Sequence, residues 1–176
     1  NELLDLINDI LDLSKVEAGK MSVDLISTDV RDIINRLHTC YLPMTHEKKL
    51  NFSTKVADDV PINIMTDSQR LFQILRNFVS NAIKFTAKGS VKIKVELSAS
   101  KEVINNKNYN PGKIINWQII DTGIGIAKKN EKMIFESFQQ AQGSISREYG
   151  GTGLGLAIAT GMSELLDGEI KLKSVE

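Results

Sequence analysis

The sequence predicts an α+β protein in which helices cover one face of a mixed, mostly antiparallel β-sheet. Two observations favour this fold class. Several long segments carry apolar residues at helical spacing, and other segments alternate apolar and polar residues as half-buried strands do. The two patterns succeed one another without the strict strand–helix–strand repetition of a parallel sheet. A two-layer α/β sandwich is therefore expected.

Each expected element has its own local signal. Residues 2–18 carry a wide apolar helical stripe, and Gly19 suits its end. One of the residues at 27–29 should cap a second helix, which Pro43 is expected to kink or end early. Asp67 resembles the N-cap of a third helix. The expected helices are 2–18, 30–48, 67–85, 131–138 and 154–166, and the expected strands are 21–25, 50–56, 91–97, 114–120 and 169–175.

Two of these strands differ in character. Residues 91–97 alternate strictly, which is typical of a strand with one wet face. Residues 114–120 are apolar and include Trp117, which predicts a more central strand. The polar residues of 100–112 predict a hairpin connection between the two strands.

Length, charge and cysteine content exclude several classes of protein. A chain of 176 residues fits one domain with a small appendage and can bury about two thirds of its unfolded surface. Its formal net charge is zero, so no nucleic-acid partner is expected. The apolar runs are too short for a membrane span, so no direct membrane contact is expected. Cys40 is the only cysteine and cannot form an internal disulfide, and a cytoplasmic domain is the simplest expectation.

A polar face on the third expected helix is the first candidate site. Four-residue spacing places Asn77 and Asn81 on one face, with Lys84 about one turn further on. Two carboxamides and an ammonium in a line can hold a hydrated magnesium ion and the phosphates that it bridges, because magnesium prefers oxygen ligands. The alternative is an ordinary amphipathic helix with polar residues toward water.

The segment Asp121-Thr-Gly123-Ile-Gly125 directly follows an apolar strand and is the second candidate. A carboxylate at a buried strand end needs a partner, and the exocyclic amine of adenine is one. Glycines would let a flat base approach the backbone. The alternative is an Asx-type turn with flexible glycines.

The third candidate is the glycine-rich segment 150–156, which precedes a helix. Backbone amides and a helix N-terminus suit phosphate oxygens, and Arg147 could add a charge-assisted contact to the terminal phosphate. The alternative is a surface loop with a solvated arginine. Phe135 and Phe138 lie at helical spacing just before it, and they fit either core positions or an aromatic hinge for a lid.

In this order and at these separations, the segments at 77–85, 121–125, 135–138 and 150–156 resemble the N, G1, F and G2 boxes of the ATP-binding domain of sensor histidine kinases. The resemblance implies the Bergerat fold of the GHKL superfamily, with ATP and Mg²⁺ as cofactors. Asn81 would be the main magnesium ligand, with Asn77 and Lys84 near the phosphates, and Asp121 would take the adenine amine. Gly123 and Gly125 would line the adenine base, and Phe135 and Phe138 would anchor the ATP lid. The residues that would wrap the phosphates are Gly151, Thr152, Gly153, Leu154 and Gly155.

The resemblance also implies a domain division. Residues 1–21 are similar to the end of the second helix of the dimerisation and histidine-phosphotransfer domain of hybrid kinases, and residues 22–176 to the catalytic domain with its last strand truncated. The acceptor histidine and the acid beside it are then expected outside this chain. The fragment should bind ATP without phosphorylating itself.

The function implied by the resemblance is that of a protein-histidine kinase. The domain would donate the γ-phosphoryl group of Mg-ATP to a histidine on the helical domain of the same kinase, and a response-regulator receiver domain would act downstream. One alternative is a degenerate module that signals by docking. Another is a GHKL-type ATPase clamp, but Asn77 stands where gyrase-like ATPases have a glutamate, and an asparagine cannot act as a base.

Overall fold

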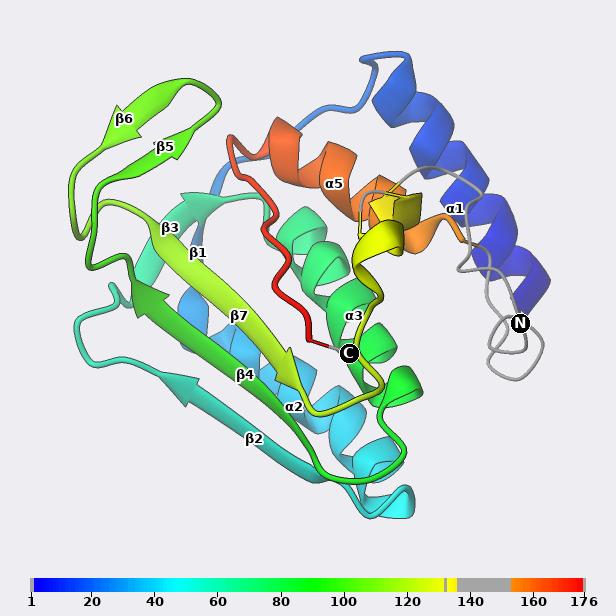
Figure 1. Ribbon diagram of the computed structural model, residues 1–176. Coiled ribbons are helices and arrows are strands. Elements are labelled where there is room, and N and C mark those ends of the chain that lie inside the picture. The colour runs from blue at the N-terminus through cyan, green and yellow to red at the C-terminus, as the bar shows by residue number, and fades with distance from the viewer. Residues whose placement is uncertain (1, 132, 136–152, 176) are drawn as a thin grey trace. The chain divides into compact units, whose positions relative to one another are not determined.

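The computed structural model describes residues 2–131, 133–135 and 153–175 (Figure 1). The chain forms two compact units. One consists of Asp24–Ile124, and the other combines residues 1–23 with residues 125–176. Within the described ranges, every helix is too short or too polar to cross a membrane.

A three-stranded mixed sheet is the centre of the unit Asp24–Ile124. Its order is β2 (Asn51–Val56), β4 (Ser90–Leu97) and β7 (Ile115–Asp121), with β2 parallel and β7 antiparallel to β4. The alternation in β4 is confirmed, because Val91, Ile93 and Val95 are fully buried on one face while Lys92 is exposed. The expectation that residues 114–120 form the more central strand is wrong for the described sheet, in which β4 has that place.

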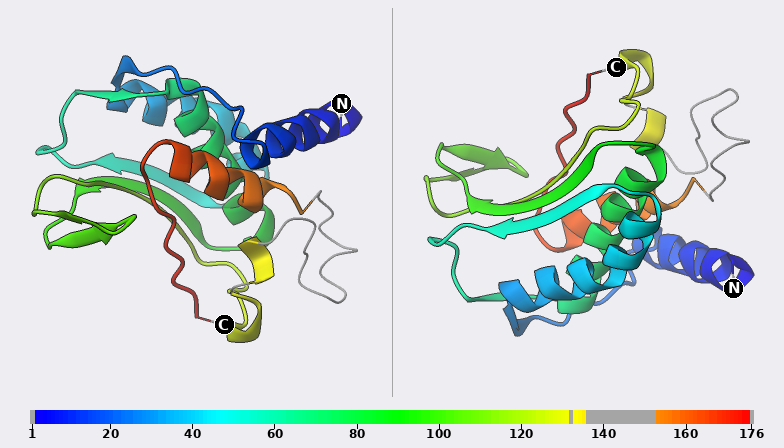
Figure 2. Two further views of the ribbon diagram at one scale, coloured as in Figure 1. Left: turned by 90° about the horizontal axis from the view of Figure 1, so that it is seen from above. Right: turned by 90° about the horizontal axis from the view of Figure 1, so that it is seen from below.

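Helices α2 (Val30–Glu47) and α3 (Ser68–Phe85) lie on one face of this sheet (Figures 1 and 2). Both begin as the sequence predicts. The side chain of Asp29 accepts hydrogen bonds from two backbone N–H groups of α2, and Asp67 does the same for α3. Pro43 lies inside α2 without ending it, so of the two effects expected of it, a kink or an early end, the early end is wrong.

The core between these helices and the sheet is apolar. Tyr41 of α2 is buried in it, and its hydroxyl donates to the carbonyl O of Arg76 in α3 at 3.2 Å. Burial raises the pKa of Tyr41 to about 12. The fully buried side chains here include Val30, Ile33, Leu37, Val79, Ile83, Val91, Ile93 and Val95.

Two short antiparallel ladders complete this unit. In the first, β1 (Ile26–Asp29) pairs with β3 (Asn63–Thr66), so the strand expected at 21–25 lies further along the chain and β3 was not expected. In the second, β5 (Glu102–Ile104) pairs with β6 (Lys107–Tyr109), a ladder that was not expected inside the connection 100–112. The connection itself joins the antiparallel strands β4 and β7, as predicted. The turn between β5 and β6 has positive φ angles at Asn105 and Asn106, as a tight hairpin turn requires.

The second unit contains α1 (Glu2–Glu17), the 3₁₀ turns η1 (Lys128–Asn130) and η2 (Met133–Phe135), and α5 (Gly155–Leu165). Helices α1 and α5 pack closely, because a Cβ on Gly161 would collide with Val16. The helix expected at 131–138 is a 3₁₀ turn where it is described, and residues 136–138 lie outside the described residues. The strand expected at 169–175 is wrong, since this stretch forms no ladder with any part of the chain that the structure describes.

Candidate nucleotide site

Helix α3 presents the first group of predicted site residues. One side of the helix is buried against the sheet through Leu71, Ile74, Leu75, Val79, Ala82 and Ile83. Asn77, Asn81 and Lys84 are only partly buried. The helix is continuous from Ser68 to Phe85, so the expected placement of these three residues along one face is confirmed.

The second group lies where β7 ends. Asp121 is exposed, so the expectation of a carboxylate at a buried strand end is wrong. Its Oδ1 accepts a hydrogen bond from the N–H of Gly123 at 2.8 Å, which is the Asx-type turn that the sequence left open. A carboxylate has two oxygens and about four acceptor positions, so this turn leaves capacity for a further donor.

The C-terminal end of α3 meets this turn directly. The carbonyl O of Phe85 accepts a hydrogen bond from the N–H of Ile124 at 3.3 Å. A Cβ added to Gly123 would lie 2.6 Å from that carbonyl O and 2.8 Å from Asp121 Oδ1. Only glycine fits there without a shift of backbone, so the turn of α3 that carries Lys84 is held beside Asp121.

Two further groups at this junction are polar. Partial burial lowers the pKa of Lys84, and its ammonium lies 5.2 Å from the centre of the Phe85 ring. Thr86, the C-cap of α3, is completely buried, and its Oγ1 has no hydrogen-bond partner among the described residues. Thr86 follows the predicted motif directly, but a single threonine after a helix gives no sequence signal of function.

The residues at this junction fit the nucleotide and the metal that the sequence predicts. Asparagine oxygens are hard donors that suit Mg²⁺ without adding negative charge beside phosphates. The missing side chain at Gly123 lets the Phe85 carbonyl and the Asp121 carboxylate approach its backbone, and Asp121 is exposed. Buried polar groups such as the Thr86 hydroxyl are satisfied in proteins by water or ligand when protein offers no partner.

The other predicted residues belong to the second unit. Gly125 and Gly153 have φ angles of +70° and +72°, a conformation that favours glycine. Leu154 is completely buried. Helix α5 begins at Gly155, so a helix N-terminus with its backbone N–H groups follows Gly153, as predicted. Phe135 is partly buried in η2. Phe138, Arg147, Gly151 and Thr152 lie outside the described residues.

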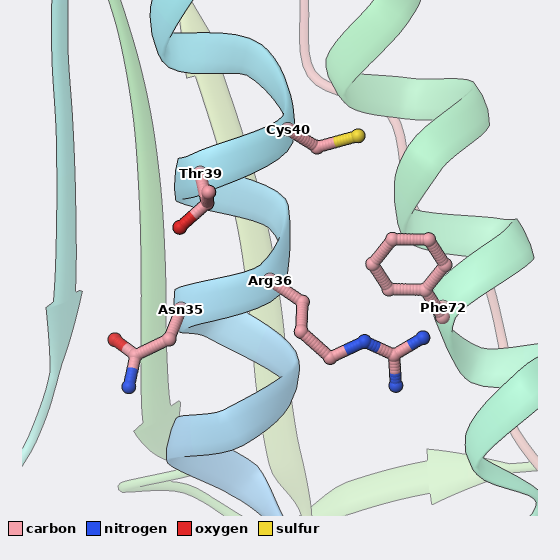
Figure 3. A pocket seen from close by; sticks show the side chains of 5 residues that line it. All are labelled: Asn35, Arg36, Thr39, Cys40 and Phe72. Atoms are coloured by element: carbon pink, nitrogen blue, oxygen red, sulfur yellow. The ribbon is translucent and has the colours of Figure 1, made fainter.

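An open groove of about 390 Å³ lies elsewhere, between α2 and α3 (Figure 3). The Arg36 guanidinium lies 4.5 Å from the centre of the Phe72 ring across it. None of the predicted site residues lines this groove, and the residues that do line it do not suggest a nucleotide site. The remaining lining residues are Asn35, Thr39 and Cys40.

Comparison with known families decides the identity of the domain. Residues 66–176, more than half of the chain, match the HATPase_c family, described as histidine kinase-, DNA gyrase B- and HSP90-like ATPases. The chain belongs to this family. The match begins one residue before the N-cap of α3 and covers every predicted site residue.

Histidine kinases are among its similar relatives. The chain is 41% identical over 174 residues to the signal transduction histidine-protein kinase BarA of Escherichia coli (strain K12), and 40% identical over 174 residues to the sensor histidine kinase GacS of Pseudomonas protegens. These alignments cover 99% of this chain but 18% of each relative. The chain thus spans less than a fifth of the length of these relatives.

Solved histidine kinases share its fold, which confirms the predicted fold class. Full-length ShkA in complex with AMPPNP matches with a TM-score of 0.74 and 30% identity, over 93% of this chain and 31% of that one. The histidine kinase AdeS of Acinetobacter baumannii matches with a TM-score of 0.73 and 22% identity, over 98% of this chain and 72% of that one. ThkA in complex with the response regulator TrrA matches with a TM-score of 0.65 and 19% identity, over 96% of this chain and 42% of that one.

Proposed function

We propose that this chain binds Mg-ATP and donates the γ-phosphoryl group to a histidine on a separate helical domain of the same kinase. A response-regulator receiver domain would then take the group in two-component signalling. The observation that carries the proposal is the junction at which Phe85 and Gly123 bring the polar end of α3 against the Asp121 turn. Membership of the ATPase family and the AMPPNP complex of ShkA support a nucleotide there.

Each residue at the junction has a proposed role. Asp121 would accept a hydrogen bond from the exocyclic amine of adenine, while its Oδ1 accepts the bond from the Gly123 N–H that forms the turn. Asn81, with Asn77, holds Mg²⁺, and the partly desolvated Lys84 faces phosphate charge. Bound Mg-ATP supplies the phosphoryl group, and the chain contributes position and charge, which is most of what phosphoryl transfer requires.

We further propose that residues 1–21 end a helix of the dimerisation domain and that residues 22–176 form the catalytic domain. Four large apolar side chains of α1 support the first part, since they are between 41% and 56% exposed. A partner helix would cover them. The four side chains are Leu4, Ile7, Ile10 and Leu11.

Because ATP is the phosphoryl donor, we also propose a cytoplasmic location.

Transfer to a separately purified helical domain tests the function. Radiolabelled ATP, Mg²⁺ and this chain are mixed with the histidine-bearing domain of the parent kinase, and label on that domain is followed with time. We expect acid-labile label that requires the acceptor histidine and is lost with Asn81→Ala. ATP binding with neither transfer nor hydrolysis would indicate a docking module. Steady hydrolysis without transfer would indicate an ATPase clamp.

A further inference from the structure

The last turn of α3 has three consecutive carbonyl groups that are bonded from outside the helix. Lys48 Nζ donates to the carbonyl O of Ile83 at 2.9 Å and to that of Lys84 at 3.3 Å. The next carbonyl O, of Phe85, accepts from the N–H of Ile124 at 3.3 Å. The last carbonyls of a helix have no partner within it, so contacts like these fix where its final turn lies.

The backbone of Lys48 is itself well held. Lys48 is the C-cap of α2, and its N–H donates to the carbonyl O of Met44 at 3.1 Å. Two residues on, the N–H of Leu50 donates to the carbonyl O of Thr45 at 2.9 Å, and both of these residues are buried. The side chain of Lys48 extends from this anchored end across to α3. A cation there is also favoured by the negative end of the α3 helix dipole.

The bonded turn is the one that carries predicted ligands. Asn81 and Lys84 lie on it, and Ile124 directly follows Gly123 in the chain. Resting on the nucleotide-binding function above, we propose that Lys48 is a positioning residue for the ATP site. Through the Ile83 and Lys84 carbonyls it holds the last turn of α3 in register with the Asp121 turn, without touching the nucleotide.

Lys48→Met tests this proposal because it keeps most of the side-chain stem and removes the donors. Lys49→Met is the matched control, since it removes the same charge one residue later. We expect Lys48→Met to weaken Mg-ATP binding about tenfold, the scale of a lost charge-assisted hydrogen bond. Lys49→Met should leave the affinity for Mg-ATP unchanged. Lys48→Arg should keep most of the wild-type affinity, because Arg can donate to two carbonyls.

Binding is measured by titration at a temperature where thermal unfolding shows each variant to be folded. A purely structural cap would lower the unfolding temperature of Lys48→Met but leave the dissociation constant of the folded protein unchanged, and that result would overturn the proposal. If Lys48→Met does not fold, Lys48→Arg and Lys48→Gln replace it. Gln carries no positive charge, so it cannot replace the charged donor of Lys48. Wild-type affinity in Lys48→Gln would then count against the proposal.

Hydrogen exchange of the nucleotide-free protein separates this proposal from the proposed function. We expect the Ile124 amide to exchange faster in Lys48→Met than in Lys49→Met, because its acceptor lies on the turn that Lys48 holds. If the Ile124 amide exchanges faster in Lys48→Met but the wild-type protein does not bind ATP, the nucleotide function is refuted while the contact of Lys48 with α3 stands. Unchanged exchange together with unchanged affinity would refute the role of Lys48 alone.

Discussion

Replacing Asp121 with Asn should weaken ATP binding without disturbing the turn that Asp121 forms. In the structure, Oδ1 accepts the Gly123 N–H at 2.8 Å, and the amide oxygen of an asparagine can accept the same bond. The other position changes from an acceptor oxygen to an NH₂ donor, which would face the donor amine of adenine. Losing a hydrogen bond to a charged group costs about 1.5–3 kcal/mol, so affinity should fall by about 10- to 160-fold.

Competition of ATP against a fluorescent ATP analogue, at constant Mg²⁺, measures this loss. Asp58→Asn, which alters an exposed carboxylate of the same unit, is the matched control and should bind normally. Thermal unfolding should show similar stability for both variants. Affinity for GTP should not fall in Asp121→Asn, because the guanine carbonyl can accept from the new NH₂. Unchanged ATP affinity in a folded Asp121→Asn variant would refute the adenine assignment.

Three further predictions concern the same unit. Gly123→Ala should destabilise the protein by about 1–3 kcal/mol in urea unfolding, because its Cβ would lie 2.6 Å from the Phe85 carbonyl O; unchanged stability would contradict that contact. Mg-ATP binding at alkaline pH should take up protons, since phosphate charge raises the lowered pKa of Lys84; calorimetry in two buffers of different ionisation enthalpy checks this, and Lys84→Met should abolish the uptake. Tyr41 has a folded pKa of about 12 against an ordinary 10.0, so its contribution to stability is complete below pH 10 and is lost as pH rises through 12. The ultraviolet difference titration of wild type against Tyr41→Phe should show that late ionisation, and a midpoint near 10 would contradict it.

Local signals in the sequence predicted the elements that carry the site. Asp67 and the apolar spacing of α3 are properties of neighbouring residues, and the structure confirms both the cap and the helix. The same holds for the alternation in β4. Strand pairing is not local, which explains one wrong prediction and one strand that was not predicted. Residues 169–175 alternate without joining a ladder among the described residues, whereas the four residues of β3 gave little pattern but pair with β1.

The chemistry of the site was predictable in its residue types but not in its contacts. Asp121 could be singled out from its place after an apolar strand, yet its exposure and its bond to Gly123 depend on how the chain turns there. The collision that excludes a side chain at Gly123 comes from a carbonyl 38 positions earlier, at Phe85. In the sequence, Lys48 looks like any surface lysine at a helix end. Only the packing of α2 beside α3 brings its ammonium to the carbonyls.

Calorimetric titration of this chain with ATP, with and without Mg²⁺, tests the central claim most directly. We expect one ATP to bind per chain, with an affinity that rises with Mg²⁺ and loses that dependence in Asn81→Ala. Well-folded protein that gives no binding heat at any temperature, and no shift of its unfolding temperature with Mg-ATP, would contradict the claim.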